Sequence, residues 1–141
     1  MVNGGYGGVM EAASRGAREA GGEAIGVTVQ AFGRRAAGNQ WLSREISEPD
    51  LSTRTRSLVD LSSGFLIMPG KAGTLAEVSF LWALNRAGLL GQRPVVLCGA
   101  AWTDLLGLLD TAGILDPDTL STTWQSDAVD GAIDLLLEKL S

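Results

Sequence analysis

The fold of this chain follows from one stretch, FLIMPGKAGTLAE at residues 65–77. Its apolar start predicts a buried strand, Pro69-Gly70 ends that strand, and a helix is predicted to begin at Thr74. Thr74 is a good N-cap, and Glu77 completes the capping-box pattern T-x-x-E. Because the first N–H groups of a helix have no partner inside it, this arrangement predicts an anion site. A well-started helix is the alternative interpretation of Thr74 and Glu77.

A second glycine loop, GGYGG, occupies residues 4–8 between a short strand and a helix predicted over residues 9–20. In an open α/β sheet, ligands bind at the carboxyl ends of the strands, so both loops are expected to face one crevice. No Gly-Lys-[Ser/Thr] follows the first loop, so it is not a Walker P-loop. No acidic residue closes the next strand, residues 24–29, and this disfavours dinucleotide redox chemistry.

Strands and helices alternate along the chain, which predicts an α/β fold with a parallel sheet and helices on both faces. No linker or internal repeat is present, and residues 1–141 are predicted to form a single domain. Residues 30–42 have no clear period and are predicted to be a loop that could cover a site. The other predicted strands are 43–47, 93–99 and 121–125, and the other predicted helices are 52–62, 102–109 and one capped by Ser126 or Asp127.

Composition excludes several classes of function. The 141 residues contain 45% hydrophobic and 19% charged residues with a net charge of −5, which suits a compact protein and disfavours nucleic-acid binding. The chain has no histidine, which excludes histidine-dependent catalysis and leaves zinc or haem without a plausible ligand set. The single cysteine, Cys98, precludes a disulfide framework. No signal peptide or long apolar run is present, which predicts a cytoplasmic protein without membrane contact.

The two glycine stretches together resemble a known family. GGYGGVM at residues 4–10, followed by Gly16-Ala17 and Gly21-Gly22, resembles the first motif of the LOG family. These proteins are cytokinin-activating phosphoribohydrolases that are often mislabelled lysine decarboxylases. PGKAGTLAE at residues 69–77 resembles the second motif of the family, Pro-Gly-Gly-x-Gly-Thr-x-x-Glu. The resemblance runs from residue 2 to about residue 106, and the pair of motifs is more specific than either alone.

The resemblance implies a Rossmann-like sheet, a homodimer and binding of a nucleoside 5′-monophosphate. The family reaction cleaves the N-glycosidic bond to give a free base and ribose 5-phosphate. By position, Glu77 would be the catalytic carboxylate that acts on the ribose, and Arg54 would be the catalytic arginine. The residues implied in phosphate or nucleotide binding are Gly5, Gly7, Gly8, Arg56, Gly70, Lys71, Gly73 and Thr74.

Arg54 and Arg56 also have a simpler interpretation, since the start of a solvated helix often carries arginines. Two residues apart on a helix, they point to different faces, so at most one is expected to reach a given ligand. No cofactor and no metal are predicted. Lysine decarboxylation is disfavoured, because neither Lys71 nor Lys139 is well placed to form the pyridoxal Schiff base that this reaction needs.

The chain departs from the family pattern at three places. Lys71 replaces a glycine, so it either adds a charge for the phosphate or occupies the space of the ligand, and it would be strained if φ there were positive. The sequence TRTR at residues 53–56 replaces the usual Met-His-x-Arg-Lys element and is closer to the branch that includes a molybdenum-cofactor carrier protein. The family strand and helix that precede the first motif have no counterpart, which implies either a truncated sequence or a partner element that fills the gap.

Three hypotheses follow for the function. The leading one is a LOG-like nucleotide-binding protein with phosphoribohydrolase activity, although whether this chain is an enzyme is left open by Lys71. The alternative is a non-catalytic carrier or sensor of a phosphorylated ligand, such as the molybdenum cofactor or a nucleotide. The third is a dimerising module that retains only the scaffold.

Overall fold

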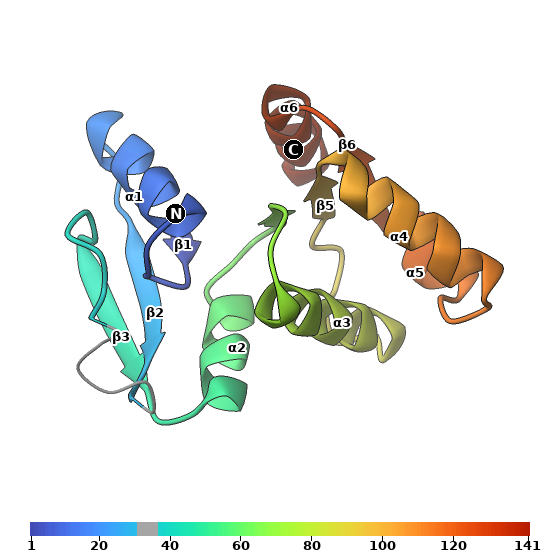
Figure 1. Ribbon diagram of the computed structural model, residues 1–141, viewed down its shortest axis with the longest axis horizontal. Helices are drawn as coiled ribbons and strands as arrows, with labels where there is room; N and C mark the ends of the chain where they lie inside the picture. The colour runs from blue at the N-terminus through green and yellow to red at the C-terminus, as the bar shows by residue number, and fades with distance from the viewer. Residues whose placement is uncertain (31–36) are drawn as a thin grey trace. The chain divides into compact units, whose positions relative to one another are not determined.

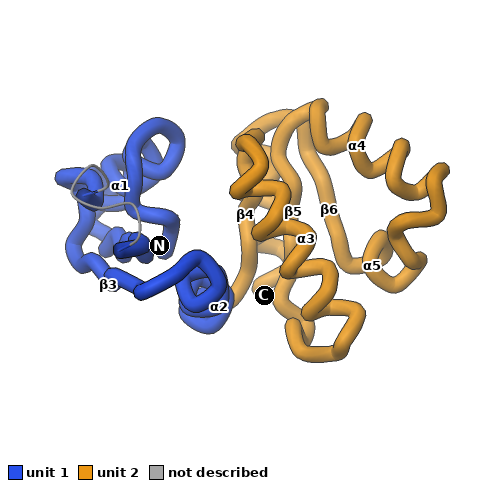
Figure 2. Tube along the Cα trace, turned by 60° about the horizontal axis from the view of Figure 1, so that its bottom comes forward, with its two compact units in different colours: residues 1–62 blue, residues 63–141 orange. Residues whose placement is uncertain are grey.

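Two parallel, three-stranded sheets form the framework of the protein in the computed structural model, which describes residues 1–30 and 37–141 (Figure 1). Each sheet belongs to its own unit, Met1–Ser62 or Ser63–Ser141 (Figure 2). The α/β class and the parallel sheets flanked by helices are confirmed. The assignment of one domain to residues 1–141 stays a prediction.

The first unit has the strand order β1-β2-β3. The central strand, β2, is apolar and nearly fully buried, as expected for a parallel strand with neighbours on both sides. Its residue Val27 lies opposite Ile46 of β3. The elements are β1 (Val2–Asn3), α1 (Val9–Glu19), β2 (Ile25–Val29), β3 (Arg44–Glu48) and α2 (Leu51–Asp60).

The second unit has the strand order β4-β5-β6, and all four residues of β5 are buried. Its elements are β4 (Phe65–Ile67), α3 (Ala72–Arg86), β5 (Val95–Cys98), α4 (Ala100–Thr111), α5 (Pro117–Ser121), β6 (Thr123–Ser126) and α6 (Val129–Leu140).

Helices cover both faces of the second sheet. Trp82 of α3 donates a hydrogen bond from Nε1 to Thr123 Oγ1 of β6 at 3.2 Å. Trp124 follows Thr123 in β6, and it packs with Ala132 of α6 against Val96. Because successive side chains of a strand point to opposite faces, α3 and α6 lie on opposite sides of this sheet.

Several predicted boundaries are wrong. Helix α3 begins at Ala72 and not at Thr74, so Thr74 is the third residue of the helix and not its N-cap, and the predicted capping box with Glu77 does not form. Helix α6 begins after Ala128, so neither Ser126 nor Asp127 is its N-cap. The short helix α5 was not expected, although Asp116 and Pro117 together are a typical helix start.

Part of the predicted covering loop, residues 31–36, lies outside the described residues. Within the described part of the chain, no helix is long and apolar enough to cross a membrane. The predicted cytoplasmic location stays a prediction.

Candidate functional site

The second glycine loop joins β4 to α3 at the carboxyl end of its sheet. Helix α3 starts without a side-chain cap from the described residues, and no acidic residue lies in its first turn. Its first backbone hydrogen bond runs from Leu75 N to Lys71 O at 3.1 Å. The N–H groups of Ala72, Gly73 and Thr74 precede that bond, as is typical of a helix start that can receive an anion.

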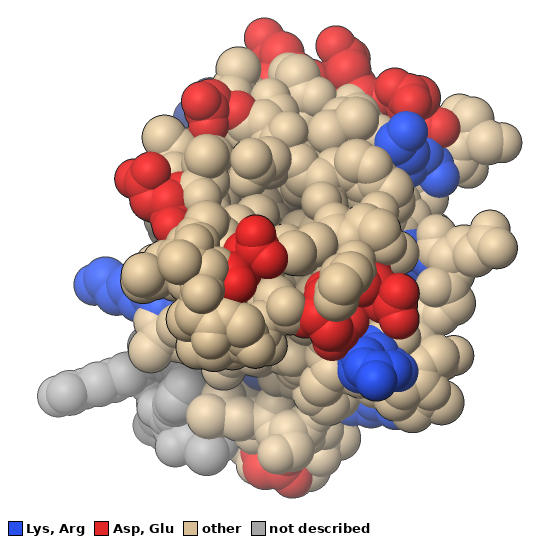
Figure 3. Space-filling view, turned by 90° about the vertical axis from the view of Figure 1, so that its right-hand side faces the viewer, with Lys and Arg blue, Asp and Glu red and all other residues tan. Residues whose placement is uncertain are grey.

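Lys71 occupies the N-cap position of α3 with φ −104° and ψ −161°. This is extended backbone that any residue can adopt, so lysine is not strained where the family pattern has glycine. Its side chain is exposed. Ser63–Ser141 carries nine acidic and only four basic residues, and acidic side chains are prominent on the face in Figure 3. A positive charge at the start of α3 is therefore a local feature of an otherwise acidic unit.

Gly70 is required by the position of Thr74. A β-carbon at Gly70 would overlap Thr74 Oγ1, so the threonine hydroxyl lies directly against the loop. A β-carbon at Gly73 would meet no atom of the described residues within 4 Å. The two glycines thus have different roles, since only Gly70 leaves room for the Thr74 hydroxyl beside the helix start.

Glu77 is half-buried on α3, three residues after Thr74. Residues three apart lie on the same face of a helix, so its carboxylate is one turn along α3 from the threonine hydroxyl. For a ligand held at the start of α3, this carboxylate would lie one turn further along the helix.

The first glycine loop is held by Asn39, a residue that sequence analysis missed. Its backbone N–H donates to Gly5 O at 2.7 Å. Its side-chain Nδ2 donates to Gly5 O at 3.2 Å, to Tyr6 O at 3.1 Å and to Ser14 Oγ at 3.4 Å. The loop carbonyls are therefore bound inside the unit. Because Asn39 belongs to no helix or strand, no periodicity in the sequence revealed it.

Asn3 holds the same loop from the other side. Its Oδ1 accepts from Gly5 N at 2.8 Å, and its Nδ2 donates to Ser14 Oγ at 2.9 Å and to Met10 O at 3.1 Å. Ser14 is fully buried and donates to Met10 O at 2.9 Å. An asparagine that accepts from the N–H two residues later is a known turn signal, so the Asn-Gly-Gly sequence could have indicated Asn3.

Arg54 lies beneath this loop and is 8% exposed, so its interpretation as a solvated residue at a helix start is wrong. Its Nε donates to Val27 O at 2.8 Å, and its guanidinium carbon lies 5.7 Å from the centre of the Tyr6 ring. A β-carbon at Gly4 would overlap its Nη2. Val27 follows the last residue of β2 that pairs with β1, so Arg54 binds a carbonyl just beyond the end of β1.

Arg56 points to the other side of α2, as the spacing predicted. Its side chain is 57% exposed and pairs with Asp60 at 2.9 Å, four residues later on the same helix. Arg54 and Arg56 are thus a buried and an exposed arginine on one helix.

Two other helices start with an aspartate cap. Asp50 Oδ1 accepts from Thr53 N at 2.8 Å at the start of α2, and Asp116 Oδ1 accepts from Thr119 N at 3.0 Å at the start of α5. These backbone hydrogen bonds lower the pKa of both carboxyls below the ordinary aspartate value. The starts of α1 and α3 have no side-chain cap from the described residues, which distinguishes the two glycine loops from these capped starts.

The predicted site residues fall in both units. Gly5, Gly7, Gly8, Arg54 and Arg56 belong to Met1–Ser62, whereas Gly70, Lys71, Gly73, Thr74 and Glu77 belong to Ser63–Ser141. The roles assigned to them stay predictions.

Comparison with known proteins identifies structural neighbours. A structural genomics target, TM1055, is 28% identical, with a TM-score of 0.71 over 97% of this chain and 76% of its own. The molybdenum cofactor carrier protein MCP of Chlamydomonas reinhardtii is 26% identical, with a TM-score of 0.67 over 99% and 76% of the two chains. The molybdenum cofactor binding protein of Rippkaea orientalis is 24% identical, with a TM-score of 0.71 over 99% and 77%, and this likeness concerns the fold alone. None of the curated protein sequences matches this chain.

A family described as "Possible lysine decarboxylase" matches residues 10–135, which include nearly all of α1, the second glycine loop and most of α6. This confirms the family that the two glycine motifs indicated. The chain belongs to the Lysine_decarbox family, the LOG-like proteins.

Proposed function

We propose that this protein binds a small phosphorylated ligand at the start of α3, as a carrier or as a nucleotide-binding protein. The observation that supports it best is the start of α3, which lacks a described side-chain cap and an acidic first turn and carries Lys71 as its N-cap residue. The helix dipole and the lysine charge both favour an anion there.

Other groups at this loop suit a phosphate. The N–H groups that precede the first helical hydrogen bond can donate to phosphate oxygens, and the Thr74 hydroxyl beside Gly70 adds a further donor. The structural neighbour from Chlamydomonas reinhardtii is named as a molybdenum cofactor carrier, which supports a carrier role. In this proposal the ligand phosphate contacts Gly70, Lys71, Gly73 and Thr74.

The first glycine loop is a less favourable place for the phosphate. Glu11 lies in the first turn of α1, and its Oε2 is 3.8 Å from the position that a Gly7 β-carbon would take. A carboxylate this close would repel a phosphate bound by Gly7 or Gly8. We therefore assign the phosphate to the start of α3, and the predicted roles of Gly5, Gly7, Gly8 and Arg56 in phosphate binding remain to be tested by substitution.

Calorimetric titration with AMP tests the proposal. The chain has only two lysines, and Lys139 provides the matched control because it lies at the end of α6, 2.7 Å from Glu138. Lys71→Ala is expected to weaken AMP binding about tenfold, as for loss of a charge-assisted contact. Lys139→Ala is expected to leave it unchanged. Equal effects of the two substitutions would contradict the proposal.

Phosphoribohydrolase activity is the second candidate, and the position of Glu77 favours it. The carboxylate lies one helical turn from the Thr74 hydroxyl, on the same face of α3. A ribose attached to a phosphate at the helix start would extend past it, where a carboxylate can stabilise an oxocarbenium-like transition state. We assign this role to Glu77. The catalytic role of Arg54, which belongs to the other unit, stays a prediction of the family resemblance.

Incubation of the protein with AMP tests the activity, with the released adenine measured by chromatography. Glu77→Gln keeps the size of the side chain and removes its charge, so it is expected to abolish release while AMP binding persists. Binding of AMP by the wild-type protein without any release of base would leave the carrier function and exclude the hydrolase for this substrate. A homodimer, implied by the family resemblance, would be measured by light scattering.

A further inference from the structure

We propose that the groove along α1 binds the flat ring of a 2-amino-6-oxopurine, as in guanine. In this site Trp41 stacks on the ring and Glu11 accepts hydrogen bonds from its N–H edge. The inference concerns only residues of the first unit, and it does not depend on phosphate binding at α3.

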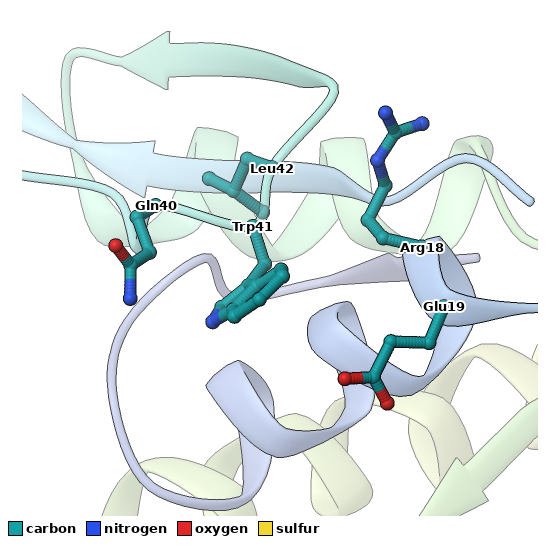
Figure 4. Close-up of a pocket in the computed structure, with 5 residues that line it drawn as sticks. All are labelled: Arg18, Glu19, Gln40, Trp41 and Leu42. Carbon is teal, nitrogen blue, oxygen red and sulfur yellow. The ribbon is translucent and has the colours of Figure 1, made fainter.

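The groove has a volume of about 600 Å³ and lies between α1 and residues 40–41. On the α1 side, three small residues and the charged residues Glu11, Arg15 and Glu19 line it, and Gln40 and Trp41 line the other side. Figure 4 shows the adjoining depression, where the indole of Trp41 extends toward α1. The α1 residues that line the groove without a long side chain are Gly8, Ala12 and Gly16.

These small residues leave the groove open to a ring. A β-carbon added at Gly16 or at Gly8 would meet no atom of the described residues within 4 Å. Trp41 is half-buried, so part of its surface faces solvent at the groove. An aromatic side chain beside a floor of small residues is the arrangement on which nucleobases stack in many proteins.

The surface of Trp41 already receives one flat group. The guanidinium carbon of Arg15 lies 5.5 Å from the centre of the indole ring. The Arg15 side chain is 59% exposed and is paired with Glu19 at 2.7 Å, also at the surface. Such surface pairs contribute little to stability, so a ligand ring can displace the guanidinium or stack together with it.

Glu11 selects the kind of ring. It lines the groove one turn before Arg15, and among the described contacts it has no hydrogen bond or ion pair. An ionised carboxylate only accepts hydrogen bonds, and its two oxygens match two adjacent N–H groups in a plane. The N1–H and 2-amino groups of guanine provide such an edge, whereas hypoxanthine lacks the amino group. Glu11 also disfavours a phosphate at this place.

Guanosine and inosine separate this site from the proposed phosphate site, because neither carries a phosphate. In calorimetric titrations, guanosine is expected to bind about tenfold more tightly than inosine, as for loss of one arm of a paired contact. Glu11→Gln is expected to remove that difference, and the exposed Glu23→Gln serves as its matched control. Trp41→Ala is expected to weaken both nucleosides by about tenfold through lost stacking.

Three outcomes would overturn the inference. The first is that neither nucleoside binds at millimolar concentration, and the second is that both bind equally well. The third is that Glu11→Gln preserves the preference for guanosine. A carboxylate that serves only the helix start would give the third outcome together with a lower melting temperature of the Glu11→Gln protein. If Lys71→Ala leaves the affinity for AMP unchanged, this result counts against the phosphate site and leaves the present inference intact.

Discussion

The two glycine loops of this protein differ in how their conformation is fixed. The first loop is held by side chains of its own unit, because Asn3 and Asn39 bind its backbone and Arg54 lies beneath Gly4. At the second loop, the closest described side chain is Thr74, one turn into the helix that the loop starts. The first loop is thus built as a rigid support, and the second leaves its helix start and Lys71 open to an anion.

The charges beside the two loops also differ. Glu11 lies in the first turn of α1, whereas α3 has no acidic residue in its first turn and has lysine at the N-cap. Two loops of similar sequence therefore favour different ligands, a donor edge at the first and an anion at the second. Glycine content alone does not identify a phosphate site.

The largest expected effect concerns Arg54. Arg54→Ala would leave a cavity under the first loop and remove the partner of Val27 O, so the free energy of unfolding is expected to fall by about 2–4 kcal/mol. Arg56→Ala on the same helix removes an exposed pair and is expected to cost about 0.5 kcal/mol or less. Urea unfolding of both variants measures the difference. Similar losses would show that Arg54 does not support the loop.

Asn39 gives the next largest effect. Asn39→Ala removes the side-chain donor to Gly5 O and Tyr6 O, and the expected loss of stability is about 1–3 kcal/mol. The neighbouring exposed Gln40→Ala is the control, with an expected change within about 0.5 kcal/mol. AMP binding at the second loop should persist in both. An Asn39→Ala protein with unchanged stability would remove the contrast between the two loops.

Substitutions of Gly70 and Gly73 test the description of the second loop. Gly70→Ala forces the Thr74 hydroxyl out of its position and is expected to cost about 1–3 kcal/mol and to weaken AMP binding. Gly73→Ala adds a methyl group in open space within a helix, so it is expected to stabilise by about 0.5–1 kcal/mol. In the double variant Gly70→Ala/Thr74→Ala the stability cost should largely disappear. Thermal unfolding and calorimetry measure the three proteins.

The smallest effect concerns the capped helix starts. The pKa values of Asp50 and Asp116 are lowered in the folded protein, so their contribution to stability is complete above the ordinary aspartate pKa. It is lost as the pH falls through the folded-state pKa values, when the carboxyls bind protons. The melting temperature should therefore fall as the pH decreases below the ordinary aspartate pKa, and less steeply in Asp50→Asn. An unchanged slope in Asp50→Asn would contradict the cap.

The sequence predicted the class of fold and the two loops because these depend on local patterns. Apolar runs next to glycines indicated the strands, and β2 and β5 are buried as expected. The start of α3 was misplaced because Thr74 and Glu77 fit a capping box, yet the helix continues back to Ala72. A favourable cap pattern does not require a helix to begin there.

Tertiary contacts explain what the sequence could not predict. Arg54 is buried because Val27 O and Tyr6 meet it from other elements, which no helical pattern reveals. Asn39 acts across 34 residues on Gly5, and its segment has no periodicity. Glu11 has no distinguishing pattern in the sequence, and only the structure places it in the groove that Trp41 also lines.

The central claim is that the second loop, and not the first, receives the phosphate. Amide chemical shifts during titration with inorganic phosphate test it most directly, because each loop reports separately. The account predicts that the amides of residues 70–75 shift in a saturable manner, while those of residues 7–10 do not, and that Lys71→Ala reduces the response. Saturable shifts at residues 7–10 with none at residues 70–75 would contradict it.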